Sequence, residues 1–549
     1  MVSIRNIIVA SILLFAGVVS AQQEDVVLKA MKDEMNRNMT SLSLKDHSKP
    51  FFIAYGINDY KILTAYATLG AVIHANEVPN RSKSVRILVG DYEFNDESLD
   101  NNLFSDPGAG EIELPLEDDY FGIRRSLWVT TDAIYKSAAK KYQKHVEYLK
   151  EQKKELKDLP HRTFAKVPVI NEVVNNTASQ PGEAQWSGYV KEISGLFKSF
   201  PEITYSGVFL TSVRGHRYLV NSEGTVVKTP NNITMMYVSA GIQNEKGRFE
   251  QDQIMYYALT PEGLPKLGDV MAQAKMMAEN LIKNSGAEAL TEDYVGPVLF
   301  VGESVAGVFQ SGLFSMDESL IASNTIRTPN SYTQEFNSTL ESKIGKNIVD
   351  NVITVTAKPT MESFNGIPLL GTYKIDDEGV RPQHELVLVD KGVLKNLLND
   401  RSLTNPNQTA NGFSEGPGVV DVSVSNGVPA ALLKEKLIRA AKEEGMEYAI
   451  MIKDETSNRM GLVNVYKISL ETGEEKFVRS AQIEDLSIRS LKKIGGASKD
   501  RQVVHLTERG LTSYIVPQAL LLNDVTILPA NIPYFEQETY VESPLKKVN

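Results

Sequence analysis

The segment from Pro297 to Gln310, PVLFVGESVAGVFQ, constrains the fold and chemistry of this 549-residue chain more than any other. A short apolar run, Val298–Val301, follows a proline and is typical of a buried strand. Gly302 is expected to form a turn, and apolar residues at helical spacing predict a helix over Glu303–Phe314. Enzymes often mount a nucleophile or a metal-binding pair on such a strand, turn and helix. This segment, however, contains no histidine.

Ser304 is the first catalytic candidate, because Gly-Glu-Ser-Val-Ala approximates the G-x-S-x-G nucleophile elbow of serine hydrolases. That function needs an acid and then a histidine downstream, and His384 or His505 could serve only if the fold brings them close. It also needs alternating strands and helices upstream, a pattern that the sequence lacks. We therefore favour a structural hydroxyl in the first turn of a helix, and we keep a serine hydrolase using Ser304 as an alternative.

The C-terminal half resembles the TldD/PmbA family, whose members are described both as modulators of DNA gyrase and as zinc metallopeptidases. The matching segments follow the order of the family and cover about residues 295–530. They are PVLFVGESVAGVFQ at 297–310, VITVTAKPT at 352–360, YKIDDEGVRPQHELVLVDKGVLKNLLNDR at 373–401, TANGFSEGPG at 409–418, SIRSLKKIGG at 487–496 and VPQALLLNDVTI at 516–527. Upstream, RYLVNSEGT at 217–225 matches a strand-turn-strand of the N-terminal part.

The resemblance also implies where a zinc site would lie. Catalytic members carry His-Glu-x-x-x-His after the apolar strand and a cysteine near the C-terminus as zinc ligands, with the glutamate as general base. Aligned through this glutamate, the chain has Gly302, Glu303 and Gly307, so only the general-base position remains. Zinc that activates water needs at least three protein donors, whereas glycine offers no side-chain donor and the chain has no cysteine. We therefore expect no zinc and no other cofactor.

The PmbA (TldE) branch of the family also lacks the histidine pair and is described as the non-catalytic partner in a two-subunit proteolytic complex. The resemblance thus implies a non-catalytic subunit that pairs with a zinc-bearing TldD-type paralogue and acts on unfolded peptides. Whether the chain is itself an enzyme stays open. The residues also leave room for an active metallopeptidase with an unrecognised metal site, and for a stand-alone peptide-binding protein.

Residues outside this segment provide no obvious replacement for the missing metal ligands. None of the seven histidines lies within five positions of another, so no helical i,i+4 pair exists. The acidic segment Asp376-Asp377-Glu378 could hold a hard cation. We interpret it instead as a turn before a strand, because Gly379 supplies the backbone freedom that such a turn needs.

The N-terminus and the charge of the chain predict an exported protein. Arg5 precedes the apolar run Ile7–Val19, which is too short for a stable membrane span, and Val19-Ser20-Ala21 is a small-residue cleavage pattern. Residues 1–21 are therefore expected to be a signal peptide cleaved near Ala21, with a periplasmic or extracellular mature protein. No later segment is apolar enough to span a membrane. The formal net charge of −11 argues against nucleic-acid binding.

We expect an α+β protein with two parts. Residues 22–290 should form a mixed sheet with long helices, and residues 291–549 a mostly-β domain that the family resemblance makes barrel-like. Periodicity predicts several strands over 51–94, interrupted at Gly56, Gly70 and Pro79-Asn80, and further strands over 203–259. Helices are predicted at Glu24–Ser41, Glu117–Lys157, Gly268–Lys283 and Ala430–Glu444.

Overall fold

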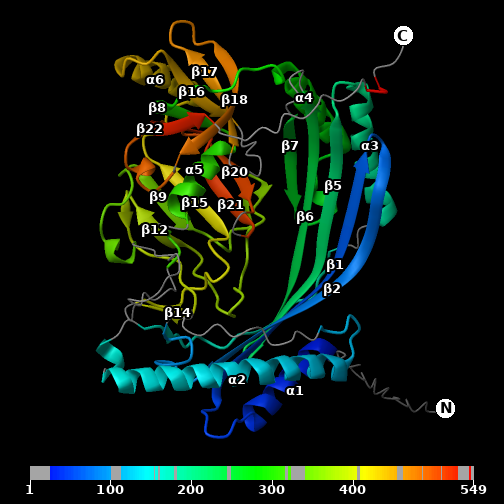
Figure 1. Cartoon of the computed structure of the whole chain (residues 1–549), viewed down its shortest axis with the longest axis vertical. Coiled ribbons are helices and arrows are strands. Elements are labelled where there is room, and N and C mark those ends of the chain that lie inside the picture. Colours follow the sequence, from blue (N-terminus) through cyan, green and yellow to red (C-terminus); the bar gives the residue numbers. More distant parts are fainter. Residues whose placement is uncertain are drawn as a thin grey trace, which may run out of the picture.

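The computed structural model describes residues 25–99, 113–153, 155–158, 161–178, 182–243, 249–315, 319–322, 340–404, 408–453, 462–484, 486–507, 510–529 and 543–545. The expected signal peptide at residues 1–21 lies outside them. The fold is mixed α+β, as predicted. A tall N-terminal sheet lies between the C-terminal part of the chain and the helix α3 (Glu183–Gly195) (Figure 1). Within the described residues, no helix is both long and apolar enough to cross a membrane.

The N-terminal sheet has six strands in the order β2-β1-β5-β6-β4, and β7 also pairs with β6. Its strands are β1 (Pro50–Thr68), β2 (Ala71–Val89), β4 (Asn171–Val173), β5 (Tyr205–Asn221), β6 (Val226–Gln243) and β7 (Phe249–Ala258). Strands β1 and β2 form one antiparallel hairpin of two 19-residue strands, whereas the sequence pattern predicts several shorter ones. Gly56 lies inside β1, and Pro79 is tolerated because β2 is an edge strand.

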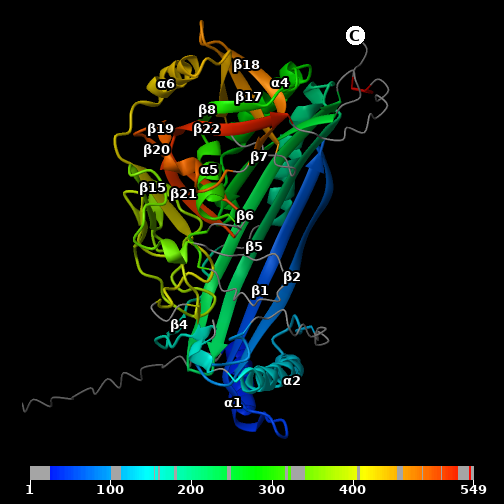
Figure 2. The same cartoon turned by 60° about the vertical axis from the view of Figure 1, so that its left-hand side comes forward.

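Helices cover one face and one end of this sheet. The buried faces of α3 (Glu183–Gly195) and α4 (Leu267–Asn284) share a core with alternate residues of the strands, such as Leu63 and Leu210. The helices α1 (Val26–Ser41) and α2 (Tyr120–Gln152) lie together at the opposite end of the molecule (Figure 2). The helices α1, α2 and α4 agree with the sequence predictions to within a few residues at each end.

The C-terminal part contains two six-stranded sheets and two helices, α5 (Ser304–Leu313) and α6 (Ala430–Glu443). The first sheet comprises β13 (Val393–Leu394), β12 (Leu386–Asp390), β9 (Ile353–Ala357), β15 (Val419–Val424), β21 (Thr512–Pro517) and β20 (Arg501–Leu506). The second comprises β18 (Glu475–Glu484), β17 (Leu462–Ser469), β16 (Tyr448–Lys453), β8 (Tyr294–Val301), β22 (Ala519–Pro529) and β19 (Ile494–Ala497). The largest core of the molecule lies between these elements.

The barrel-like expectation for the C-terminal part needs correction, because none of the described sheets is closed into a barrel. In the second sheet, the end of β22 also pairs with β18, so that this sheet curls without becoming a closed barrel. The first sheet ends at β13 and β20. Its strands are only two to six residues long. Two short ladders complete the fold, β10 (Ser363–Phe364) with β11 (Ile367–Pro368), and β3 (Thr163–Phe164) with β14 (Ser402–Leu403).

Candidate functional site

The turn between β8 and α5 is the position at which the sequence predicts a remnant active site. Gly302 has a φ of +70°, in the region that favours glycine, and its N–H donates to the Gln518 carbonyl at 2.9 Å. Glu303 is the exposed N-cap residue of α5, which begins at Ser304. Gly307 is buried one turn into the helix. Gly302 therefore precedes the helix, while Gly307 lies within it.

Ser304 is a buried structural residue of this turn, only 3% exposed. Its hydroxyl accepts a hydrogen bond from the Val301 N–H at 3.1 Å and donates to the Val301 carbonyl at 2.9 Å. The two candidate histidines contact other hydroxyls, since His384 pairs with Thr360 and His505 with Ser513. The hydrogen bonds of Ser304 thus hold the strand-to-helix turn together, as the structural interpretation of this serine predicts.

Glu303 faces β7 of the N-terminal sheet. Burial raises the pKa of Tyr257 on β7, a hydrogen bond with Thr507 lowers it, and the negative charge of Glu303 raises it further. The Tyr257 ring packs edge-on to His505, with 6.5 Å between the centroids. Burial lowers the pKa of His505 to about 4, so this imidazole is neutral at neutral pH. We call Glu303, Tyr257 and His505 the Glu303 cluster, which joins the two parts of the chain.

The residues at the β8–α5 turn do not fit a zinc ion. Gly302 and Gly307 present no donor atom, and the chain has no cysteine. Among the residues that the structure describes, no group of three or more histidine, aspartate or glutamate side chains is arranged to hold a metal ion. Asp376-Asp377-Glu378 forms a turn closed by Gly379, whose φ is +77°, and the Asp376 carboxylate accepts the Val380 N–H at 2.7 Å.

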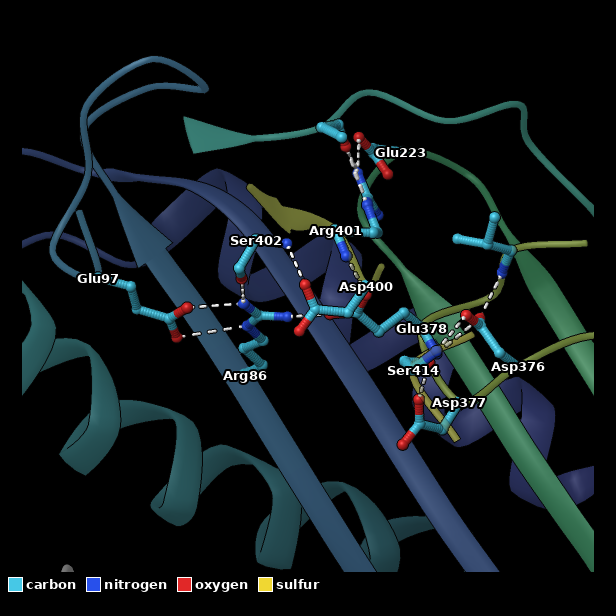
Figure 3. Close-up of polar contacts among 12 residues, drawn as sticks. Arg86, Glu97, Glu223, Asp376, Asp377, Glu378, Asp400, Arg401, Ser402 and Ser414 are labelled. Carbon is cyan, nitrogen blue, oxygen red and sulfur yellow. Dashed lines mark hydrogen bonds and ion pairs between the residues drawn. The ribbon is translucent and has the colours of Figure 1, made fainter. Parts of the chain in front are cut away.

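Sequence reasoning missed a second polar group of residues, a buried arginine cluster near the other end of the N-terminal sheet. Figure 3 shows Arg86 of β2 between Glu97 on one side and Glu378 on the other. Arg401 is fully buried and donates to the Ala165 carbonyl at 2.7 Å and to Glu223 at 2.8 Å. The arginine cluster consists of Arg86, Glu97, Glu223, Glu378, Asp400 and Arg401. The acidic turn and the Asp400-Arg401 pair, both in family-like segments, were its only sequence signals.

Burial sets the charge states in the arginine cluster. It raises the pKa of Asp400 to about 7, and the adjacent Glu378 contributes to this rise. Burial also raises the pKa of Glu378, against the attraction of Arg86. Glu97 is buried too, yet the charge of Arg86 and its hydrogen bonds hold the pKa of Glu97 below its usual range. The cluster therefore holds ionised pairs together with one carboxyl, Asp400, that is protonated under mildly acidic conditions.

Ion pairs between arginine and glutamate join the N-terminal part with the C-terminal part over the length of the molecule. One side chain of each pair belongs to the N-terminal part and the other to the C-terminal part. The pairs are Arg86–Glu378, Arg217–Glu415, Glu172–Arg381, Glu223–Arg401 and Glu250–Arg479. Because most of these side chains are partly or fully buried, the pairs fix how the two parts sit against each other.

A hollow of about 460 Å³ lies beside the arginine cluster. It is lined by residues 91–93 and 163–166. Lys166 lies over the Tyr92 ring at 4.5 Å from its centroid, and the Tyr92 hydroxyl donates to Glu223. The lining mixes Asp91 and Glu93 with Lys166, so it carries no dominant charge that would identify a ligand.

Comparisons with known proteins agree with this architecture. Residues 328–528 match the family model described as the PmbA/TldA metallopeptidase C-terminal domain. A protein of Methanothermobacter thermautotrophicus named metalloprotease is 44% identical over 64 residues, which are 12% of this chain and 13% of the relative. The chain therefore matches only a small share of that relative's length.

Solved structures resemble nearly the whole chain. A protein of Thermotoga maritima described as a candidate modulator of a DNA gyrase superposes with a TM-score of 0.56 at 13% identity, covering 90% of this chain and 100% of the other. TldE of Thermococcus kodakarensis gives a TM-score of 0.55 at 13% identity, with 91% and 99% covered. At this identity the likeness shows the fold alone. The chain is thus an α+β protein whose C-terminal part matches a domain described as that of a metallopeptidase family. Residues 328–528 carry the C-terminal domain of the TldD/PmbA family, and nearly the whole chain has the fold of the solved structures of this kind.

Proposed function

We propose that this chain is a non-catalytic subunit of an exported zinc peptidase complex that acts on unfolded peptides. The observation that carries the proposal is the pair of glycines, Gly302 and Gly307, at the positions of the zinc-binding histidines. Glu303 keeps the position of the general base, but without metal-bound water it has no proton to abstract. A zinc-bearing TldD-type paralogue would provide the hydrolytic centre, and this chain would contribute to binding the substrate.

Export is the second part of the proposal. It rests on the basic and apolar pattern of residues 1–21 and on the small residues before Gln22. The paralogue would then be exported as well, because both subunits must meet in the same compartment. We therefore place the complex in the periplasm or outside the cell.

The alternatives differ in what they require of the β8–α5 turn. A serine hydrolase requires an accessible nucleophile, whereas the Ser304 hydroxyl is buried and bonded to the backbone of its own turn. An active metallopeptidase requires a metal site, for which the described residues offer no group of ligands. A stand-alone peptide-binding protein requires neither, so only the search for a partner separates it from the proposed subunit.

Co-purification from the native host, followed by an assay with casein as an unfolded substrate, tests the proposal. We expect the chain to bring down a zinc-bearing paralogue and the complex to cleave casein. Glu303→Gln in this chain should leave that activity nearly unchanged, while the corresponding substitution in the paralogue should abolish it. Elemental analysis of the chain alone should find no stoichiometric zinc. If the chain alone cleaves casein and Glu303→Gln stops cleavage, it is itself the peptidase and the proposal is wrong.

A further inference from the structure

The N-terminal sheet has a face that its helices do not cover. Alternate residues of a strand point to opposite faces, and Leu63, Ala65 and Ala67 of β1 point into the core beneath α3 and α4. The residues between them, such as Tyr66, point away from these helices. In both views this second face is directed toward the C-terminal part of the chain (Figures 1 and 2).

A row of large side chains runs across this face from strand to strand, with one residue from each of five neighbouring strands. We call each such set of residues aligned across the strands a level of the sheet. The strand register places each member directly opposite the next on the neighbouring strand. We call this set the aromatic row; from β2 to β7 it comprises His74, Tyr66, Phe209, Tyr237 and Met255. Neighbouring rings of the row contact one another. The Phe209 and Tyr237 rings are stacked with their centroids 5.1 Å apart, and the centroids of the His74 and Tyr66 rings are 5.8 Å apart.

The neighbouring levels of the sheet complete a surface without formal charge. One level carries Asn76, Thr64, Thr211, Met235 and Tyr257 in register. The next carries Val78, Ile62, Val213 and Ile233. No aspartate, glutamate, lysine or arginine stands at these positions, in a chain of which 23% is charged. Such a face suits uncharged apolar groups rather than ions.

The side chains of the aromatic row remain accessible. Met255 is 38% exposed, His74 is exposed, and Tyr66 and Phe209 are half-buried. Large apolar side chains that gather on one partly exposed face typically mark a binding surface. Because the face is directed toward the C-terminal part (Figures 1 and 2), a narrow extended chain suits it better than the broad surface of a folded partner.

The aromatic row leads to the Glu303 cluster. Tyr257 lies two residues after Met255 on the same strand and therefore on the same face. Its ring packs against His505, and its pKa is influenced by Glu303 at the start of α5. A chain bound along the aromatic row would therefore reach the β8–α5 turn, the position of the active site in catalytic relatives. Five strands spaced at about 4.8 Å span about 19 Å, which is the length of roughly six extended residues.

We propose that the aromatic row binds an extended, unfolded polypeptide segment and selects segments rich in aromatic and aliphatic side chains. The proposal rests on the proposed function, because it names the surface of this subunit that receives the peptide substrate. Rings at the level of Phe209 offer flat apolar surfaces for such side chains, and the thioether of Met255 adapts to different shapes. Thr211 and the amide nitrogen of Asn76, whose side-chain oxygen accepts from Thr64, can hydrogen-bond to peptide groups of the bound segment.

Peptide binding measured by fluorescence anisotropy tests this proposal on the purified mature chain. The probe is a fluorescein-labelled 12-residue peptide in which phenylalanine and leucine alternate with serine and asparagine. Its control has serine in place of every phenylalanine and leucine. We expect the first peptide to bind and the second to bind at least about tenfold more weakly, because the apolar side chains supply the contact.

Substitutions locate the binding surface. Met255→Ser should weaken binding about threefold, and Phe209→Ser with Met255→Ser about tenfold or more. Met276→Ser is the matched control, since Met276 is a 58% exposed methionine of α4, on the helix-covered side of the sheet. It should leave binding unchanged. Met255→Ser keeps the test decisive if the double variant fails to fold, because Met255 lies on an edge strand and is exposed.

Each other outcome overturns the inference. Equal binding of both peptides would show that the chain does not select apolar side chains. Equal binding by Met255→Ser and Met276→Ser would show that the peptide does not bind at the aromatic row. Absence of binding by the wild-type chain would also refute it, since the surface exists in the isolated chain. None of these results decides whether a zinc-bearing paralogue co-purifies, so the proposed function stands or falls separately.

Discussion

The guanidinium carbon of Arg401 lies 4.0 Å from the centroid of the Phe164 ring. The two residues come from different parts of the chain, which the short β3–β14 ladder pairs at this point. The same guanidinium donates to the Ala165 carbonyl and to Glu223. Arg401 therefore anchors the C-terminal part to the N-terminal part through ring stacking, hydrogen bonding and charge.

Arg401→Lys should destabilise the protein. A lysine keeps the positive charge, but its compact ammonium group cannot stack on Phe164 and bond to both Ala165 and Glu223. Weakening the pair between the fully buried Arg401 and the partly buried Glu223 leaves polar groups without compensation, so we expect a loss on the order of 3 kcal/mol in the free energy of unfolding. Urea unfolding measures it. Arg439→Lys, at an exposed position on α6, is the matched control and should change stability by less than about 0.5 kcal/mol. Equal stability of the two variants would contradict the anchoring role.

Asp400→Asn should change how stability depends on pH. Burial and Glu378 raise the pKa of Asp400 to about 7 in the folded state, while Arg86 and Arg162 oppose this rise. An unfolded aspartate has a pKa near 3.9, so the folded state holds the extra proton between about pH 4 and pH 7. The contribution of this group is therefore fully present below pH 4 and is lost as the pH rises toward 7.

The variant should accordingly be more stable than the wild type above pH 7, by at most about 4 kcal/mol, with the difference shrinking toward pH 4. Comparing the two proteins at each pH cancels other titrating groups. His145 is one of them, because burial lowers its pKa to about 4 and its contribution to stability falls as the solution is acidified. Asp293→Asn, at an exposed position, serves as control. A pH-independent difference would show that Asp400 is ionised throughout.

Local sequence patterns predict the helices, but they fail for the long strands, whose length is set by pairing within the sheet. The helices α1, α4 and α6 carry apolar residues at helical spacing, and that signal is contained in a dozen residues. The prediction of several short strands in place of the long hairpin is wrong, because Gly56 and Pro79 do not interrupt the strands that contain them. Within a wide twisted sheet, pairing with neighbouring strands outweighs such local preferences.

The functional surfaces differ in how far the sequence could reveal them. The β8–α5 turn could be recognised in the sequence as a candidate site because its residues are consecutive. The arginine cluster was missed because Arg86, Glu223 and Arg401 are more than a hundred residues apart, and no local pattern connects them. The aromatic row alternates along each strand, but only the register of five strands aligns Tyr66 with Phe209. Charge and aromatic content are visible in a sequence, whereas alignment across strands is set by the tertiary fold.

Ser304→Ala should affect stability and not a covalent reaction. A fluorophosphonate probe is expected to leave the wild-type chain unlabelled, because the Ser304 hydroxyl is buried and hydrogen-bonded to Val301. Removing the hydroxyl deletes these bonds, so the free energy of unfolding should fall by about 1 kcal/mol. Ser423→Ala, at an exposed position on β15, is the control for stability. Labelling of the wild type that disappears in Ser304→Ala would restore the serine-hydrolase alternative.

Introducing the family's two histidines should fail to create a zinc site in this chain. Gly302→His places a side chain at a φ of +70°, which costs about 1–2 kcal/mol for a residue with a Cβ, and this position precedes α5. Gly307→His supplies a second donor from within the buried helix. The cysteine ligand of catalytic relatives has no counterpart, because the chain contains none. Two imidazoles fall short of the three protein donors that a catalytic zinc ion requires.

We therefore expect elemental analysis of the double variant after dialysis against trace zinc to give far less than one zinc per chain, and urea unfolding to show a loss of stability. One zinc per chain would mean that a third ligand lies close to the turn, and the view of this chain as a degenerate subunit would have to be abandoned.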